Sequence, residues 1–136
     1  MPQITPINTK EPLLYADLSY KVIGIVYKVY NALGYGYKEK EYQKAIANEL
    51  ESNQITFQRE LYSNVKYNGE LLTKFYLDFL IDNKIVLETK IANQVYKKHF
   101  SQVLQYLKSN NLKLGIIVVF TPDGIITKRI INEKEH

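Results

Sequence analysis

Hydrophobic residues recur along this chain with two different periods, and the change of period divides the chain into helical and extended segments. Spacings of three and four residues give one apolar stripe to each of three predicted helices, over residues 13–33, 38–52 and 95–109. Alternating or continuous apolar runs predict strands over residues 55–61, 63–67, 70–81, 85–90, 114–120 and 125–131. This order predicts a mixed α/β fold, in which helices flank a central mixed sheet with an antiparallel meander in its middle.

Turn residues support these boundaries. Gly34 follows the first apolar stripe and is expected to end that helix. Asn68-Gly69 is typical of a two-residue hairpin turn between two strands. The run from Leu114 to Phe120 is apolar throughout and rich in β-branched residues, which indicates a strand covered on both faces. The helix between residues 95 and 109 is expected to cross over the sheet to reach it.

Three charged residues, Asp78, Glu88 and Lys90, interrupt the apolar strands of the predicted hairpin over residues 73–90. A two-residue loop would put the apolar faces of the two strands out of phase, whereas a three-residue loop over residues 82–84 places Asp78 opposite Glu88. Directly opposed residues have Cβ atoms about 5 Å apart. Two carboxylates so close repel each other, and a divalent cation between them would remove that repulsion. Lys90 shares the face of Glu88, because side chains alternate along a strand.

Spacing alone leaves two interpretations of this cluster open. The first is a metal site with a lysine beside it, and the second is an ion pair in which Lys90 neutralises the two acids. Glu39, in the first turn of the second helix, is either a further member of the site or an acid that favours a helix N-terminus. His99 is expected on the surface, at the flank of the third helix, and serine–histidine chemistry is not expected.

Composition narrows the class of protein. The 136 residues predict one domain over residues 13–131, with tails over 1–12 and 132–136. The net charge of +4 and the pI near 9.1 give a mild bias toward polyanionic partners. The chain has no cysteine, which excludes disulfides and thiolate chemistry and fits a cytoplasmic location. No apolar run is long enough to span a bilayer, so no membrane partner is expected. Most of the 12 tyrosines are expected in the core.

Asp78 and the tripeptide Glu88-Thr89-Lys90 resemble the D…ExK signature of the PD-(D/E)XK nuclease superfamily. The resemblance extends over residues 13–131 and implies a restriction-endonuclease-like core. It implies that Asp78 and Glu88 bind a divalent cation, Mg²⁺ or Mn²⁺, with the backbone carbonyl of Thr89 as an extra ligand. Lys90 resembles the catalytic lysine of that superfamily.

Two motifs in the predicted helices make the resemblance to this superfamily more specific. Residues 36–42 are similar to the motif that names the GxxExxY family, in which Glu39 is the helix acid that completes the catalytic and metal-binding site. Residues 102–106 resemble the QxxxY motif that some exonuclease-like members carry after the lysine. The expected substrate-binding residues are Tyr42, His99, Gln102 and Tyr106.

The predicted function is a Mg²⁺- or Mn²⁺-dependent nuclease that hydrolyses phosphodiester bonds of DNA or RNA. Four basic residues are candidates for phosphate contacts: Lys40, Lys74, Lys97 and Lys98. The alternative is a catalytically silent nucleic-acid-binding or protein-interaction module that keeps the fold, which the complete set of acids and lysine disfavours. A homodimer formed through the exposed edge of the sheet is a further expectation.

Overall fold

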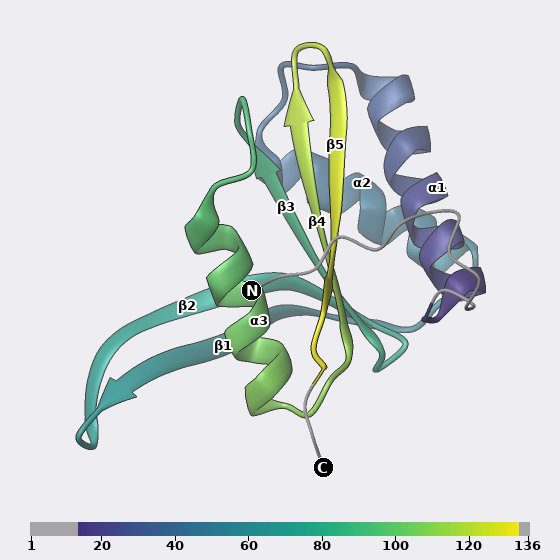
Figure 1. Cartoon of the computed structure of the whole chain (residues 1–136). Helices are drawn as coiled ribbons and strands as arrows, with labels where there is room; N and C mark the ends of the chain where they lie inside the picture. Colours follow the sequence, from purple (N-terminus) through teal and green to yellow (C-terminus); the bar gives the residue numbers. More distant parts are fainter. Residues whose placement is uncertain (1–13, 134–136) are drawn as a thin grey trace.

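The computed structural model describes residues 14–133 and has the predicted order of elements, except that two predicted strands form one (Figure 1). The elements are α1 (Ala16–Leu33), α2 (Glu39–Ser52), β1 (Phe57–Tyr67), β2 (Glu70–Ile81), β3 (Ile85–Ile91), α3 (Lys97–Ser109), β4 (Leu114–Thr121) and β5 (Gly124–Ile131).

A five-stranded sheet in the order β1-β2-β3-β4-β5 carries the fold. Strands β1, β2 and β3 form an antiparallel meander. Helix α3 then crosses over, so that β4 lies parallel to β3, and β5 returns antiparallel to β4. The mixed sheet, its meander and its crossover helix are therefore confirmed.

Helices cover both faces of this sheet (Figure 1). On one face α1 and α2 pack against a core cluster that contains Phe79, Leu87 and Phe120. On the other face Val103 of α3 and its neighbours form a second cluster. All residues of β4 are buried, as its continuous apolar run predicts. The fold is thus a three-layer α/β arrangement, which agrees with the predicted class.

The predicted starts of two helices need small corrections. Helix α1 begins at Ala16 and not near residue 13, because Tyr15 has a left-handed backbone with φ 51°. Helix α3 begins at Lys97 and not at Val95, because Tyr96 is extended with ψ 148°. Gly34 ends α1 as predicted, and its N–H donates to the carbonyl of Tyr30 at 2.7 Å.

The predicted break between residues 61 and 63 is wrong, because Tyr62 stays paired with Tyr76 and β1 continues through it. Strands β1 and β2 extend together as an arm that projects from the body (Figure 1). At its tip Asn68 and Gly69 have φ of 51° and 80°, which confirms the two-residue turn.

The expectation that most tyrosines lie in the core is also wrong, since eight of the 12 are exposed. Tyr62 and Tyr76 pack edge to face across the arm, with ring centroids 5.6 Å apart, yet each is half exposed. Tyr42 and Tyr106 are the buried tyrosines among residues 14–133.

The predicted N-terminal tail over residues 1–12 lies outside the described residues, as do residues 134–136. Asn132 is buried, and its backbone N–H and side-chain amide donate to the carbonyls of Lys113 and Leu112, each at 2.9 Å. Packed structure therefore continues past Ile131. Within residues 14–133, no helix is both long and apolar enough to cross a membrane.

Candidate active site

Asp78 and Glu88 lie together where β2 and β3 stop pairing. The loop over residues 82–84 has the predicted length, because Ile81 pairs with Ile85 and Phe79 pairs with Leu87. Beyond that pair the two acids replace the backbone ladder. The N–H of Asp78 donates to Oε1 of Glu88 at 3.0 Å, and the N–H of the residue after Glu88 donates to Oδ2 of Asp78 at 2.7 Å. The predicted pairs Ile81–Ile85 and Phe79–Leu87 are confirmed, and just beyond them the two acids are joined by a hydrogen bond rather than as a third strand pair.

Burial makes this acidic pair electrostatically unfavourable. Glu88 is only 2% exposed, and desolvation raises its pKa to about 8, with a further rise caused by the charge of Asp78. Desolvation also raises the pKa of Asp78, opposed by hydrogen bonds from Thr89 and by the charge of Lys90. Nζ of Lys90 lies 3.4 Å from Oε2 of Glu88. One lysine against two acids leaves one negative charge uncompensated when both carboxyls are ionised.

Glu39 reaches the same end of β3 from the first turn of α2. Its Oε2 accepts a hydrogen bond from the N–H of Ile91 at 2.9 Å, directly after Lys90 in the chain. Glu41, and not Glu39, caps the N-terminus of α2, because its Oε1 accepts a hydrogen bond from the N–H of Lys38 at 2.9 Å. The two acids of this turn therefore have separate roles.

The structure does not join Glu39 to the acidic pair as a third close ligand. Among residues 14–133, no three side chains of the types His, Cys, Asp and Glu are grouped closely enough to hold a metal ion. The part of Glu39 as a metal ligand, like that of the Thr89 carbonyl, stays a prediction. The Asp78–Glu88 pair itself fits a hard cation, because carboxylate oxygens are the donors that Mg²⁺ and Mn²⁺ prefer.

A hydrogen-bonded row behind Asp78 was not foreseen from the sequence. The Thr89 hydroxyl donates to Oδ2 of Asp78 at 2.7 Å and accepts from Nε2 of Gln43 at 3.2 Å. Arg59 lies 5.3 Å above the ring of Phe79 and donates to Oε1 of Gln43 at 3.5 Å. The available signal was the position of Gln43, one helical turn after Glu39 and so on the same side of α2.

The expected substrate-binding residues differ in their surroundings. Tyr42 is fully buried, stacks on Phe120 with centroids 4.2 Å apart, and donates its hydroxyl to the carbonyl of Gly34. It has no surface to offer a substrate, so its role here is in the core. Tyr106 is also buried, with its pKa raised by desolvation, while Gln102 is partly exposed.

His99 is not on the surface, contrary to expectation. It is 7% exposed, and Tyr96 packs edge-on against its ring at 5.7 Å between centroids. Desolvation lowers its pKa, assisted by the charges of Lys90 and Lys98 and opposed by Glu39. His99 lines a hollow of about 370 Å³ beside the acidic pair, together with Glu39 and Lys90.

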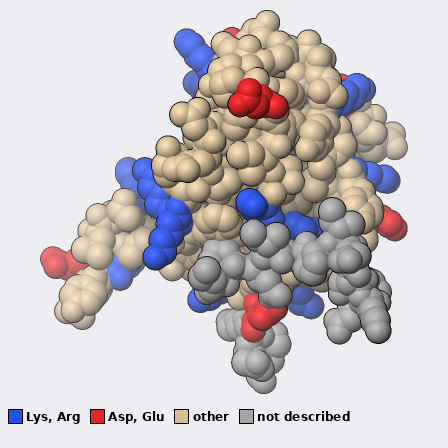
Figure 2. Space-filling model, turned by 45° about the horizontal axis from the view of Figure 1, so that its top comes forward, with Lys and Arg blue, Asp and Glu red and all other residues tan. Residues whose placement is uncertain are grey.

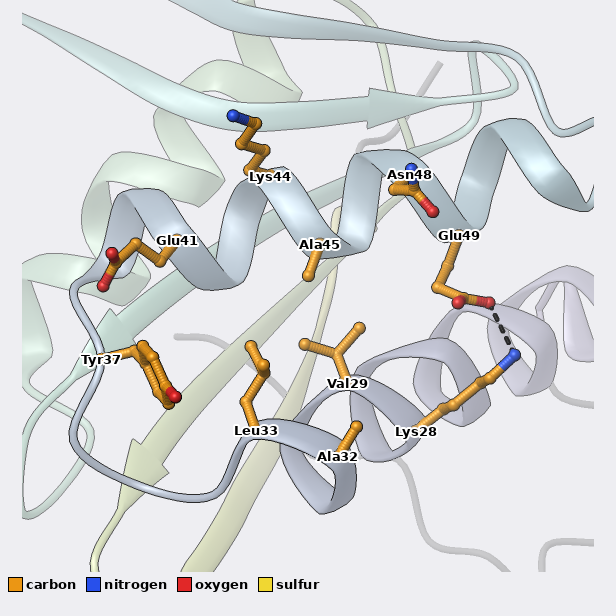
Figure 3. A pocket seen from close by; sticks show the side chains of 10 residues that line it. All are labelled: Lys28, Val29, Ala32, Leu33, Tyr37, Glu41, Lys44, Ala45, Asn48 and Glu49. Atoms are coloured by element: carbon orange, nitrogen blue, oxygen red, sulfur yellow. Dashed lines mark hydrogen bonds and ion pairs between the residues drawn. The ribbon is translucent and has the colours of Figure 1, made fainter.

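A second hollow, of about 520 Å³, lies between α1 and α2 and holds none of the predicted site residues (Figure 3). Its floor is apolar, formed by Val29, Leu33 and Ala45, and the Lys28–Glu49 ion pair crosses its rim at 2.9 Å.

The comparisons with known proteins agree with this fold. A model of the PD-(D/E)XK nuclease superfamily matches residues 16–131, and the chain therefore belongs to that superfamily. No curated protein matches the chain significantly. A solved structure titled "Crystal structure of SSO0001" is similar in fold, with a TM-score of 0.54 and 23% sequence identity. The match covers 89% of this chain and 62% of that one, so the chain spans less than two thirds of that protein.

Proposed function

We propose that this chain is a nuclease that uses Mg²⁺ or Mn²⁺ to hydrolyse phosphodiester bonds of DNA or RNA. The observation that carries the proposal is the contact between Asp78 and Glu88 at the end of the β2–β3 ladder, with Lys90 against Glu88. A buried acid, Glu88, beside a partly buried one, Asp78, with one lysine is unfavourable for stability unless a cation completes the group. Membership of the superfamily supports the same chemistry.

Each residue of the group has a role that follows from its position. Asp78 and Glu88 would hold the cation, which when bound supplies positive charge to the scissile phosphate and acidifies water. The Lys90 side chain is partly exposed, whereas Glu88, against which its ammonium group lies, is buried. From there it can orient water and stabilise negative charge that develops on the phosphate. Glu39 fixes the backbone just beyond Lys90 through Ile91.

The basic side chains on the surface favour a polyanionic substrate. In the face shown in Figure 2, Lys and Arg side chains gather in a band where the β1–β2 arm meets the body. Their contribution would be general attraction of the phosphate backbone rather than sequence recognition.

The test is cleavage of single- and double-stranded DNA and RNA with Mg²⁺, Mn²⁺ or a chelator. Lys90→Ala should lower metal-dependent cleavage by about 10²–10³-fold, because it removes the cation nearest the reacting phosphate. Lys84→Ala is the matched control, since Lys84 is an exposed lysine of the adjoining loop that also pairs with an acid, Asp82, at 3.3 Å. Equal activity of both variants would contradict the proposed role of Lys90.

One observation favours a second candidate, a nucleic-acid-binding module without turnover. Among the described residues the acidic pair lacks a third close ligand, and Glu39 is engaged by Ile91. For such a module, binding of oligonucleotides would persist in chelator and no substrate would be cleaved with either metal.

A further inference from the structure

A hollow of about 370 Å³ adjoins the acidic pair at the start of α3. Its lining includes the charged and aromatic residues Glu39, Lys90, Tyr96, Lys98 and His99. Lys90 belongs to both places, because it lines this hollow and pairs with Glu88. Any group bound in the hollow is therefore a direct neighbour of the proposed catalytic site.

The helix that opens into this hollow has a start unlike those of the other two helices. Helices α1 and α2 each have an acidic residue in the first turn, whereas the first turn of α3 has none and instead contains Lys97 and Lys98. No side chain of the described residues caps α3, since its N-cap is Tyr96. Free N–H groups and two lysines at the positive end of a helix dipole repel one another, and an anion there would relieve this.

His99 gives an independent indication of a ligand in the same place. It is more than nine-tenths buried and lines the hollow, and its Nδ1 is buried without a hydrogen-bond partner among residues 14–133. In the neutral ring one nitrogen carries the proton and the other accepts, and with no partner at Nδ1 the proton can sit on Nε2. Nε2 is not shut off from solvent in this way, so it is free to donate to a ligand oxygen.

Among residues 14–133, Glu39 is the one acid that lines the hollow, and its negative charge opposes an anion. One of its oxygens is already held by the N–H of Ile91. Against its single charge stand Lys90, Lys98 and the start of α3. The balance of charge in the hollow is therefore positive, although Lys90 shares its charge with Glu88.

We propose that this hollow is a phosphate-binding subsite, in which the start of α3, Lys98 and His99 hold a phosphate group of the substrate strand next to the scissile one. The assignment to the substrate strand rests on the proposed nuclease function, whereas the affinity for phosphate does not. The shared chemistry is that of a tetrahedral oxyanion at a helix N-terminus.

The test is a titration of the full chain with inorganic phosphate in the presence of chelator, followed by two-dimensional ¹H–¹⁵N NMR. Saturable shifts should concentrate on the backbone amides of Lys97 and Lys98 and on the His99 ring. Lys98→Gln, at an exposed position, should weaken the affinity about tenfold, the loss expected for one charge-assisted hydrogen bond. His99→Ala should do the same, and Lys98→Gln keeps the test valid if His99→Ala does not fold.

Lys108→Gln, in the last turn of α3, is the control and should leave the affinity unchanged. Shifts that do not saturate, or that respond equally to Lys98→Gln and Lys108→Gln, would overturn the subsite. A single-stranded oligonucleotide should compete with phosphate for the same amides, and failure to compete would overturn the assignment to the substrate strand. Because no step requires cleavage, a chain that cleaves but does not bind phosphate here contradicts this inference alone.

Discussion

One carboxylate oxygen of Asp78 accepts two hydrogen bonds from Thr89, one from the backbone N–H and one from the hydroxyl, each at 2.7 Å. Both bonds favour the ionised form and lower the pKa of Asp78 against the desolvation that raises it. Gln43 holds the Thr89 hydroxyl from the other side at 3.2 Å. Thr89 therefore fixes the position of this carboxylate and opposes the rise in its pKa.

Thr89→Val should lower the rate of metal-dependent cleavage about tenfold or more, because the shape is kept while one hydrogen bond to a charged group is lost. Thr89→Ser keeps that hydroxyl and should retain most of the activity. The measurement is the cleavage rate as a function of pH. For Thr89→Val the acidic limb should move to higher pH, since the pKa of Asp78 rises. Thr73→Val, on the exposed arm, is the matched control. An unshifted pH profile would leave Thr89 with a purely structural role.

Glu88 predicts a pH dependence of stability for the metal-free protein. Its pKa is about 8 when folded and near the ordinary 4.5 when unfolded, so the folded state binds more protons between these values. The contribution of Glu88 to the free energy of unfolding is therefore highest below about pH 4.5. This contribution is lost as the pH rises from there through about 8. Urea denaturation in chelator across this range should show the fall, and Glu88→Gln should flatten it.

A divalent cation should oppose the same effect. A cation bound by ionised Glu88 favours the charged form, so saturating Mg²⁺ or Mn²⁺ should stabilise the wild-type protein most at the alkaline end of the range. Glu88→Gln should lose most of that gain. Stabilisation of equal size in both proteins would mean that the cation binds elsewhere.

The β2–β3 site was predictable because strand alternation and loop length fix it from local sequence. The three-residue loop works because Asp82 and Asn83 both adopt left-handed φ, of 52° and 53°, which their short polar side chains tolerate. Once this loop closes, the contact between Asp78 and Glu88 follows from the register. What the register did not reveal is that the acids take the place of ladder hydrogen bonds.

The placement of α3 was less accessible to sequence reasoning. His99 follows two lysines and lies at the edge of an apolar stripe, a pattern equally compatible with an exposed residue. Its burial depends on how closely α3 approaches β3 and β4, which is a tertiary property. Likewise the link from Gln43 to Thr89 joins residues 46 apart in the chain. Helical spacing gives the side of α2 but not the partner that meets it.

Gly115→Ala tests the close approach of α3 to the sheet. A Cβ at Gly115 would lie 2.5 Å from Cγ1 of Val103, closer than two carbons can pack, and 3.5 Å from Cδ1 of Leu107. Because Val103 is β-branched and buried, the helix has to shift, and the free energy of unfolding should fall by about 1–3 kcal/mol. Denaturant unfolding measures this loss. Val103→Ala in the same chain should recover part of it, and no recovery would place the strain elsewhere.

Glu60 marks the point where the arm leaves the body. It has a left-handed φ of 57°, and the β1–β2 register passes from Arg59–Phe79 to Leu61–Leu77 without pairing Glu60 to Asp78. This gap releases Asp78 from β1, so that its N–H is free to donate to Glu88. The irregular residue on the edge strand thus helps to form the acidic pair.

Glu60→Gly should preserve this gap and raise the free energy of unfolding by up to about 1 kcal/mol, because glycine adopts a left-handed backbone without strain. Gln58→Gly is the control, at an exposed position of the same strand that has no positive φ. There glycine should lower stability by about 0.5–1 kcal/mol through its greater freedom in the unfolded chain. Glu60→Val should destabilise, since a β-branched residue resists positive φ, and should also reduce cleavage by disturbing Asp78. Denaturant unfolding and cleavage assays on the three variants check this. Equal losses of stability for both glycine substitutions would mean that the left-handed backbone of Glu60 costs no stability.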